Sequence, residues 1–252
     1  MSPAIALARA ELLALSRDRV AAFTAVLVPL VAAAYLIVNP PPADEIAGPL
    51  ASAAAAVTLV LFTSAAVVIK SVTTLVRRRE QHLLERWRIA GAAPTAILAG
   101  TLAPGFLLLA MGAAAMFTAI GIALDDAPAQ PVWLVVAALL AAVLGAAAAT
   151  LGAAVARTSD AASIVALPVV GALIGGAMWT TFVPLAEVTW PMRATGGGAL
   201  AELDRIGWDG PADGGGLVTS LTAAAPSLLV LAGLSIALGL GATRAFRWRA
   251  RG

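Results

Sequence analysis

Six segments of this chain carry no Asp, Glu, Lys, Arg or His over a membrane-spanning length, and this feature restricts the possible folds most strongly. They are residues 20–38, 49–69, 96–124, 131–156, 161–184 and 217–243. About 20 apolar residues cross a bilayer as an α-helix. The alanine and leucine content of the segments favours helix, and they lack the alternation of apolar and polar residues that marks membrane β-strands. The sequence therefore predicts an all-α, polytopic membrane protein with six transmembrane helices.

The composition supports this prediction. Of the 252 residues, 61% are hydrophobic and 12% are charged, whereas about 25% are charged in average soluble domains. The chain has no cysteine, which excludes disulfides and thiolate metal sites. No linker is long enough to separate two domains, so we expect a single transmembrane domain over 1–252.

The distribution of charge predicts which side of the membrane each connection faces. With six spans, the termini and the second and fourth connections share one side, and they hold 14 of the 16 basic residues but five of the 14 acidic residues. The two sides therefore carry +9 and −7. Lys and Arg in short loops remain in the cytoplasm. We therefore expect both termini to be cytoplasmic in a multi-pass protein of the cell membrane.

Two further segments have features of their own. Residues 3–19 place Ile5, Ala8, Leu12 and Leu15 at helical spacing, which predicts an amphipathic helix on the inner membrane surface; a solvated tail is the alternative. In the predicted outer segment 185–216, glycine triplets disfavour helix except for a short one over 199–206. Trp190 and Trp208 suit the interfacial belt.

The spans lack the ionisable residues that proton-driven transporters usually place within the membrane. We interpret Lys70 as an anchor at the end of the second span. His82 and Glu85 have a spacing that a metal pair can use, but a solvated polar face is the simpler interpretation. No catalytic motif and no phosphate-binding loop of the form G-x-x-x-x-G-K-[ST] occurs. We expect no enzymatic activity and no cofactor bound by this chain itself.

The stretch RRREQHLLERWRIAGAAP, residues 77–94, holds seven of the thirty charged residues between two apolar spans. As a helix over 77–91, it gathers its apolar side chains on one arc and arginines around it. Such a helix suits either the anionic inner leaflet or a groove on a cytoplasmic partner. A loop that only enforces topology has no need of Leu or Trp, so the apolar arc favours docking. The arc is made of Leu83, Leu84, Trp87, Ala90 and Gly91.

In layout the whole chain resembles the permease subunits of type-2 ATP-binding cassette (ABC) exporters, which include drug and antibiotic exporters. The residues that carry the resemblance lie in three places. In a cytoplasmic pattern like R-E-x-G-T-L-E, His82 and Leu83 stand where the pattern has Gly and Thr. The matching residues are Arg79, Glu80, Leu84 and Glu85 in that pattern, Pro168, Gly175, Gly176 and Pro184 around the fifth span, and Phe246, Arg247 and Trp248 after the last span.

The resemblance implies an N-terminal interfacial helix, six spans and a cytoplasmic coupling helix. It implies two permease subunits, identical or paired with a sister permease, in the bilayer, a separate ABC ATPase dimer that binds ATP and Mg, and no role for nucleic acid. The implied ATPase-coupling residues are Arg79, Glu80, Leu83, Leu84, Glu85, Trp87 and Arg88. The implied pore-lining residues in the second and fifth spans are Thr58, Phe62, Thr63 and Trp179.

The expected function is export of a hydrophobic or amphipathic compound such as a drug, an antibiotic or a lipid-like molecule. Two alternatives belong to other classes. One is a membrane assembly or anchor protein that transports nothing, and the other is a secondary transporter or channel that works without ATP. An ATPase that copurifies with the chain would separate the exporter from both.

Overall fold

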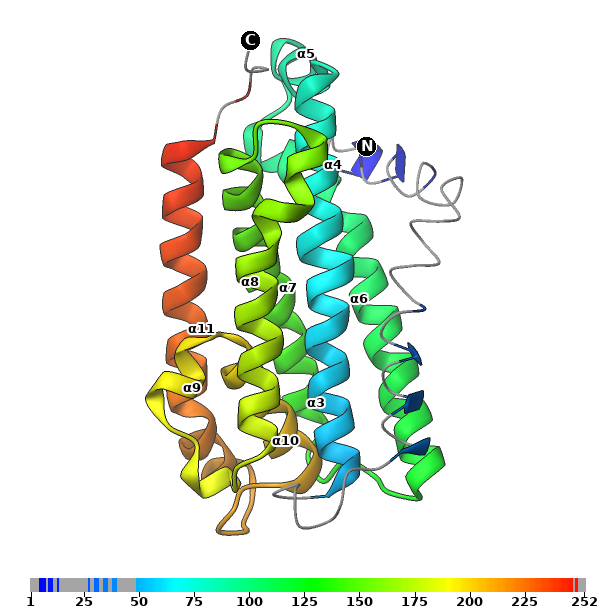
Figure 1. The fold of residues 1–252 in the computed structure, drawn as a ribbon, viewed down its shortest axis with the longest axis vertical. Coiled ribbons are helices and arrows are strands. Elements are labelled where there is room, and N and C mark those ends of the chain that lie inside the picture. The colour runs from blue at the N-terminus through cyan, green and yellow to red at the C-terminus, as the bar shows by residue number, and fades with distance from the viewer. Residues whose placement is uncertain are drawn as a thin grey trace.

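The computed structural model describes residues 5–7, 9–10, 13, 27, 30–31, 34–35, 38–39, 49–246 and 248. Within this part of the chain every regular element is a helix, and the long helices stand side by side as a bundle (Figure 1). The predicted surface helix over 3–19 and the predicted first span over 20–38 fall outside the continuously described residues.

Five helices in the described part are long and apolar enough to cross a membrane, which confirms five of the predicted spans in length and composition. Four of them begin and end within three residues of the predicted bounds, whereas the second predicted span, 49–69, continues to Glu80, so Lys70 lies within the helix and the prediction of an anchor at its end is wrong. Proline occupies the first turn of two of them, where its missing N–H costs nothing. The five are Leu50–Glu80, α6 (Pro94–Leu124), α7 (Pro131–Val155), α8 (Ser159–Thr181) and α11 (Leu217–Ala245).

The second predicted span is the central helix of the bundle. It is continuous through α3 (Leu50–Phe62), a π-helical segment η1 (Thr63–Ile69) and α4 (Lys70–Glu80). It contacts α6, α7 and α8 and is the most buried of the five spans. The π-helical segment is wider than an α-helix. It fits because Gly105 of α6 and Gly145 of α7 face it: a Cβ at Gly105 would lie 2.7 Å from the Ala66 carbonyl oxygen.

The segment between the fifth and sixth predicted spans forms three short helices. They are η2 (Leu185–Glu187), α9 (Trp190–Ala194) and α10 (Gly197–Asp209). The predicted helix over 199–206 exists but is longer, and the expectation that the first glycine triplet disfavours helix is wrong for Gly197 and Gly198. These glycines permit close packing, since a Cβ on Gly197 would lie 1.7 Å from the Leu173 carbonyl oxygen of α8.

Helix α10 is inserted into one end of the bundle instead of lying on its surface. It packs against α3, α7, α8 and α11, and twelve of its thirteen residues are buried. Backbone N–H groups of Ala129 and Gln130, in the α6–α7 turn, donate to carbonyls of Trp208 and Gly207 at 2.9 and 2.8 Å. Trp208 is buried, so its predicted place in an interfacial belt is wrong, whereas Trp190 is exposed.

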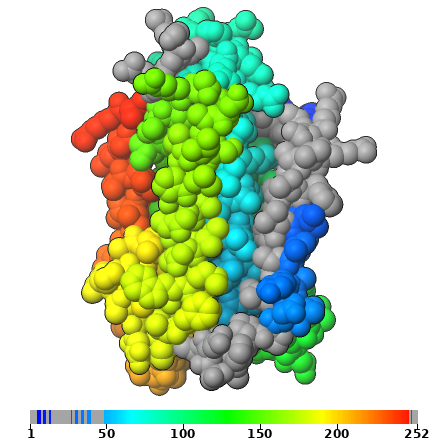
Figure 2. Space-filling view, viewed as in Figure 1, coloured from blue at the N-terminus to red at the C-terminus, as the bar shows by residue number. Residues whose placement is uncertain are grey.

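The bundle therefore has two different ends, which we name by the short helices at each. The α5 end carries α5 (Leu83–Ile89) and the end of α11, and the α10 end carries α9, α10 and the α6–α7 turn (Figure 1). Figure 2 shows the residues of the α9 region packed closely on α8 at the α10 end.

Candidate functional site

The charged end of the central helix turns a sharp corner. Helix α4 ends at Glu80 and α5 begins at Leu83, and between them His82 has φ 57° and ψ 14°. Few residues with a Cβ adopt this left-handed conformation, although His does so more readily than most. The single helix predicted over 77–91 is therefore wrong. The chain changes direction at His82, and α5 packs against α4 and α6.

Arg79 points into the bundle and caps the end of a neighbouring helix. Its side chain is 1% exposed, and its guanidinium donates from Nη1 to the Ala153 carbonyl at 2.7 Å and from Nη2 to the Ala156 carbonyl at 2.5 Å. These carbonyls belong to the last turn and the C-cap of α7. A cation is favourable there, because the carbonyls at a helix C-terminus lack partners within the helix and carry partial negative charge.

Glu80 makes the complementary contact with the next helix. Its Oε1 accepts a hydrogen bond from the Ser159 backbone N–H at 2.8 Å, and the Thr158 hydroxyl accepts one from the Ala161 N–H at 3.3 Å. A carboxylate is favourable at this helix N-terminus for the same electrostatic reason. Arg79 and Glu80 thus hold both ends of the short α7–α8 connection.

The predicted coupling residues of α5 divide between two faces. Leu84 is fully buried within the chain, and Leu83 and Trp87 are half-buried. Glu85 lies 3.7 Å from His82 Nδ1. Arg88 is exposed, and its guanidinium carbon lies 5.1 Å from the ring centre of Trp248, a cation–π contact.

Ile89 is not among the predicted coupling residues. It lies at the end of α5 and is 80% exposed, so it offers more apolar surface to a partner than Leu84 does. The prediction missed Ile89 because it assumed one helix over 77–91. A helical wheel of that length places Leu84 and Trp87 on a common apolar arc that does not include Ile89. On the outer face of α5, Arg86, Arg88 and Ile89 are exposed and Trp87 is half-buried.

Three of the four predicted pore-lining residues lie inside the chain. Thr58, Phe62 and Thr63 are buried, and the two hydroxyls donate to carbonyls of their own helix. Phe62 fills the space beside Gly112 of α6, where a Cβ would lie 2.3 Å from its ring. Trp179 of α8, in contrast, is 49% exposed.

A second polar cluster lies at the α10 end, where the sequence predicted an outer loop. Arg193 of α9 forms a two-pronged ion pair with Glu202 of α10, from Nε and Nη2 to the two carboxylate oxygens at 2.6 Å each. The Ser227 hydroxyl of α11 donates to Glu202 at 2.5 Å. The ion pair with the guanidinium and the hydrogen bond from the hydroxyl together offset the cost of burying Glu202.

Arg205 repeats the arrangement of Arg79 at the opposite end of the bundle. Its Nη1 donates to the carbonyls of Thr180 and Val183, at 2.8 and 2.9 Å, which lie at the C-terminus of α8. Burial lowers the pKa of Arg205 from its usual value, and the carboxylates of Asp209 and Glu202 oppose that shift.

Asp204 is buried without a hydrogen-bond partner among the described residues. Burial raises its pKa well above the ordinary 3.8, and repulsion from Asp209 adds to the shift. The central span contains Lys70, whose Nζ is buried, and the buried Arg79. Helix α10, which is not a span, brings Glu202, Asp204 and Arg205 into the bundle as well. Sequence reasoning about the spans alone did not detect these interior charges.

The structure thus brings most of the predicted coupling residues together at the α5 end, and it places the predicted pore residues on different faces of two helices. No group of three or more His, Asp or Glu side chains that could hold a metal ion occurs in the described part of the chain. Comparisons with family models, with curated proteins and with solved structures yield no match to this chain.

Proposed function

We propose that this chain is the permease subunit of an ATP-driven type-2 ABC exporter. It works with a second permease subunit, identical or a sister chain, and with a separate ATPase dimer that supplies the energy. The cargo is a hydrophobic or amphipathic compound that moves out of the cell. The sequence resemblance motivates this proposal, and the geometry of the α5 end supports it.

The observation that carries the proposal is the corner between α4 and α5. Its outer face presents Trp87, Arg88 and Ile89, a mixture of apolar and cationic side chains suited to a groove on a partner. Its inner face is anchored by Leu84, and the adjacent Arg79 and Glu80 hold the α7–α8 connection. A displacement of α5 would therefore be transmitted to the central helix and, through Arg79 and Glu80, to α7 and α8.

The orientation follows from charge. Among the described residues, Arg77, Arg78, Arg86 and Arg88 gather at the α5 end, and a basic loop remains in the cytoplasm. The α10 end would then face outward. The proposed location is the cell membrane, with the ATPase bound beneath α5.

Purification of the full-length chain from its native membrane tests this function. We expect an ATPase with a phosphate-binding loop to copurify in near-equal amount, and the complex to hydrolyse ATP while the isolated chain does not. Absence of any such ATPase under conditions that retain the bilayer would contradict the proposal.

Asp204 favours one second candidate, a proton-coupled transporter that needs no ATPase. Ionisable groups buried within membrane proteins often form proton pathways, and Asp204 is buried with no hydrogen-bond partner in the described part of the chain. Uptake by vesicles that contain only this chain, driven by a pH gradient and abolished by Asp204→Asn, would support this candidate over the exporter.

A further inference from the structure

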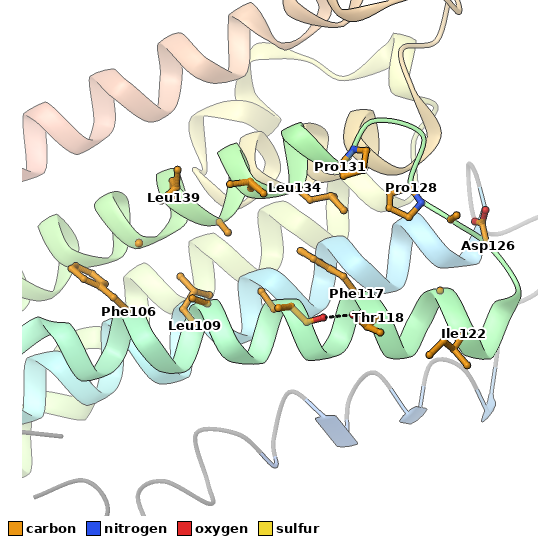
Figure 3. A pocket seen from close by; sticks show the side chains of 18 of the residues that line it. Phe106, Leu109, Phe117, Thr118, Ile122, Asp126, Pro128, Pro131, Leu134 and Leu139 are labelled. Atoms are coloured by element: carbon orange, nitrogen blue, oxygen red, sulfur yellow. Dashed lines mark hydrogen bonds between the residues drawn. The ribbon is translucent and has the colours of Figure 1, made fainter. Parts of the chain in front are cut away.

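An apolar groove of about 1170 Å³ runs along the outer surface between α6 and α7, at the α10 end of the bundle. Figure 3 shows Phe106 and Phe117 of α6 on one wall, Leu134 and Leu139 of α7 on the other, and Asp126 in the turn that joins them. The volume suits one drug-sized organic molecule.

Small side chains explain why the groove stays open. Ala110 and Ala114 lie one helical turn apart on the α6 wall, and Ala138 and Ala142 do so on the α7 wall. The two helices are consecutive in the chain, yet they contact each other far less than α7 contacts α11. The alanines therefore leave space between the larger apolar side chains of the two walls.

The charge of the groove is confined to one end and has one sign. Asp125 and Asp126 line it at the α6–α7 turn, and none of the described residues that line it is basic. The Trp208 indole donates to Asp126 Oδ2 at 2.9 Å, which holds this carboxylate in position. Thr118, the only other polar side chain among the described lining residues, donates its hydroxyl to the Ala114 carbonyl of its own helix.

Aromatic rings lie near these carboxylates. Phe117 lines the groove and stands edge-on to Trp208, with ring centres 6.2 Å apart. An aromatic ring attracts an organic cation through its negative face. A fatty acid or another anionic amphiphile would place its head group against two carboxylates, which repel it.

We propose that this groove binds a lipophilic organic cation, with its apolar body between α6 and α7 and its charge beside Asp125 and Asp126. The proposal names the class of cargo for this chain and so rests on the proposed export function. The binding test below needs no ATPase, so its failure and the failure of the export proposal can be told apart.

The probes are methyltriphenylphosphonium and its neutral counterpart of similar shape, triphenylphosphine oxide. Saturable binding is measured on the full-length chain in nanodiscs of zwitterionic lipid, and binding to empty discs is subtracted. We expect the cation to bind more tightly than the neutral compound, and its affinity to fall as salt is added.

Variants locate the site. The double variant Asp125→Asn/Asp126→Asn is expected to bind the cation about tenfold more weakly, while the exposed Asp213→Asn behaves as wild type. Ala114→Phe, which fills the groove, should abolish saturable binding, and its exposed neighbour Ala115→Phe outside the lining should not.

Equal binding of the two probes would overturn the proposal. So would wild-type affinity in the Asp125→Asn/Asp126→Asn variant, even if Ala114→Phe abolished binding, since that combination describes an uncharged lipid groove. The carboxylates lie at the surface end of the groove, so their substitution leaves the bundle core intact. If Ala114→Phe misfolds, the Asp125→Asn/Asp126→Asn variant and the comparison of the two probes still decide between the outcomes.

Discussion

At the scale of single residues, two of the buried charged side chains in the described part of the chain follow one physical rule. The carbonyls at a helix C-terminus need donors, and Arg79 and Arg205 each supply them to a neighbouring helix. Glu202 is matched by Arg193. Asp204 does not follow the rule, because no described residue bonds to its carboxylate.

Asp204 should make stability depend on pH. Burial raises its pKa in the folded state above 3.8, so the folded chain binds this proton more tightly than the unfolded chain does. Its favourable contribution to the unfolding free energy is complete below pH 3.8 and is lost as pH rises through the raised pKa. Thermal unfolding in detergent should show stability falling with pH.

Asp204→Asn should flatten this decline and raise stability at neutral pH, because the amide cannot ionise. Asp213→Asn, at an exposed position, is the matched control and should leave the profile unchanged. If the Asp204→Asn and wild-type profiles coincide over the same pH range, the carboxyl is not the group that titrates.

At the scale of elements, hydropathy identified the five described spans, because a helix needs about 20 predominantly apolar residues to cross the bilayer. Helix α10 escaped the same reasoning. Its residues are typical of a glycine-rich outer segment with charges at 202, 204 and 205. Only tertiary contacts reveal that Glu202 is paired with Arg193, that Arg205 donates to the C-terminus of α8 and that Asp204 is buried. The first glycine triplet is predicted to disfavour helix, but Gly197 permits close approach to α8 and Gly198 permits close approach to α9.

The coupling stretch was predicted in composition but not in shape. A helical wheel assumes one helix axis. The left-handed conformation at His82 divides the stretch into two helices with different axes. Leu84 consequently faces the core and Ile89 faces outward. Arg79 and Glu80 were expected to take part in coupling, and their contacts suggest that they would act by holding the α7–α8 connection.

The α7–α8 connection provides a test of that arrangement. Arg79→Met keeps much of the side-chain length but leaves the carbonyls of Ala153 and Ala156 without their donors. We expect a loss of about 3 kcal/mol in stability and faster proteolysis within residues 156–158. Arg77→Gln, at an exposed position of the same helix, should change neither. Wild-type resistance to protease in Arg79→Met would contradict this role.

At the scale of the whole molecule, the uneven charge and the two dissimilar ends give the bundle a direction. The chain has no native cysteine, so single cysteines report sidedness cleanly. Ala212→Cys at the α10 end and Gln81→Cys at the α5 end are both exposed positions. On intact cells, an impermeant thiol reagent should label the first and leave the second unlabelled. The reverse pattern would invert the proposed orientation.

The central claim is that the outer face of α5 docks into an ATPase. A few large side chains usually dominate such interfaces, so Ile89→Ala and Trp87→Ala should each weaken capture of the cognate ATPase by about 2 kcal/mol, or about 30-fold. Arg88→Ala should have a smaller effect that diminishes with salt. Val155→Ala, an exposed apolar position at the same end of the bundle but outside α5, is the matched control.

Capture of the purified ATPase by full-length variants in nanodiscs is the most direct measurement. Leu84→Ala is kept separate, because Leu84 is buried within the chain and its loss would report on folding. We expect the Ile89→Ala and Trp87→Ala variants, inserted normally in the membrane, to lose the ATPase while Val155→Ala retains it. Wild-type capture by both α5 variants would contradict the claim that this helix couples the chain to its source of energy.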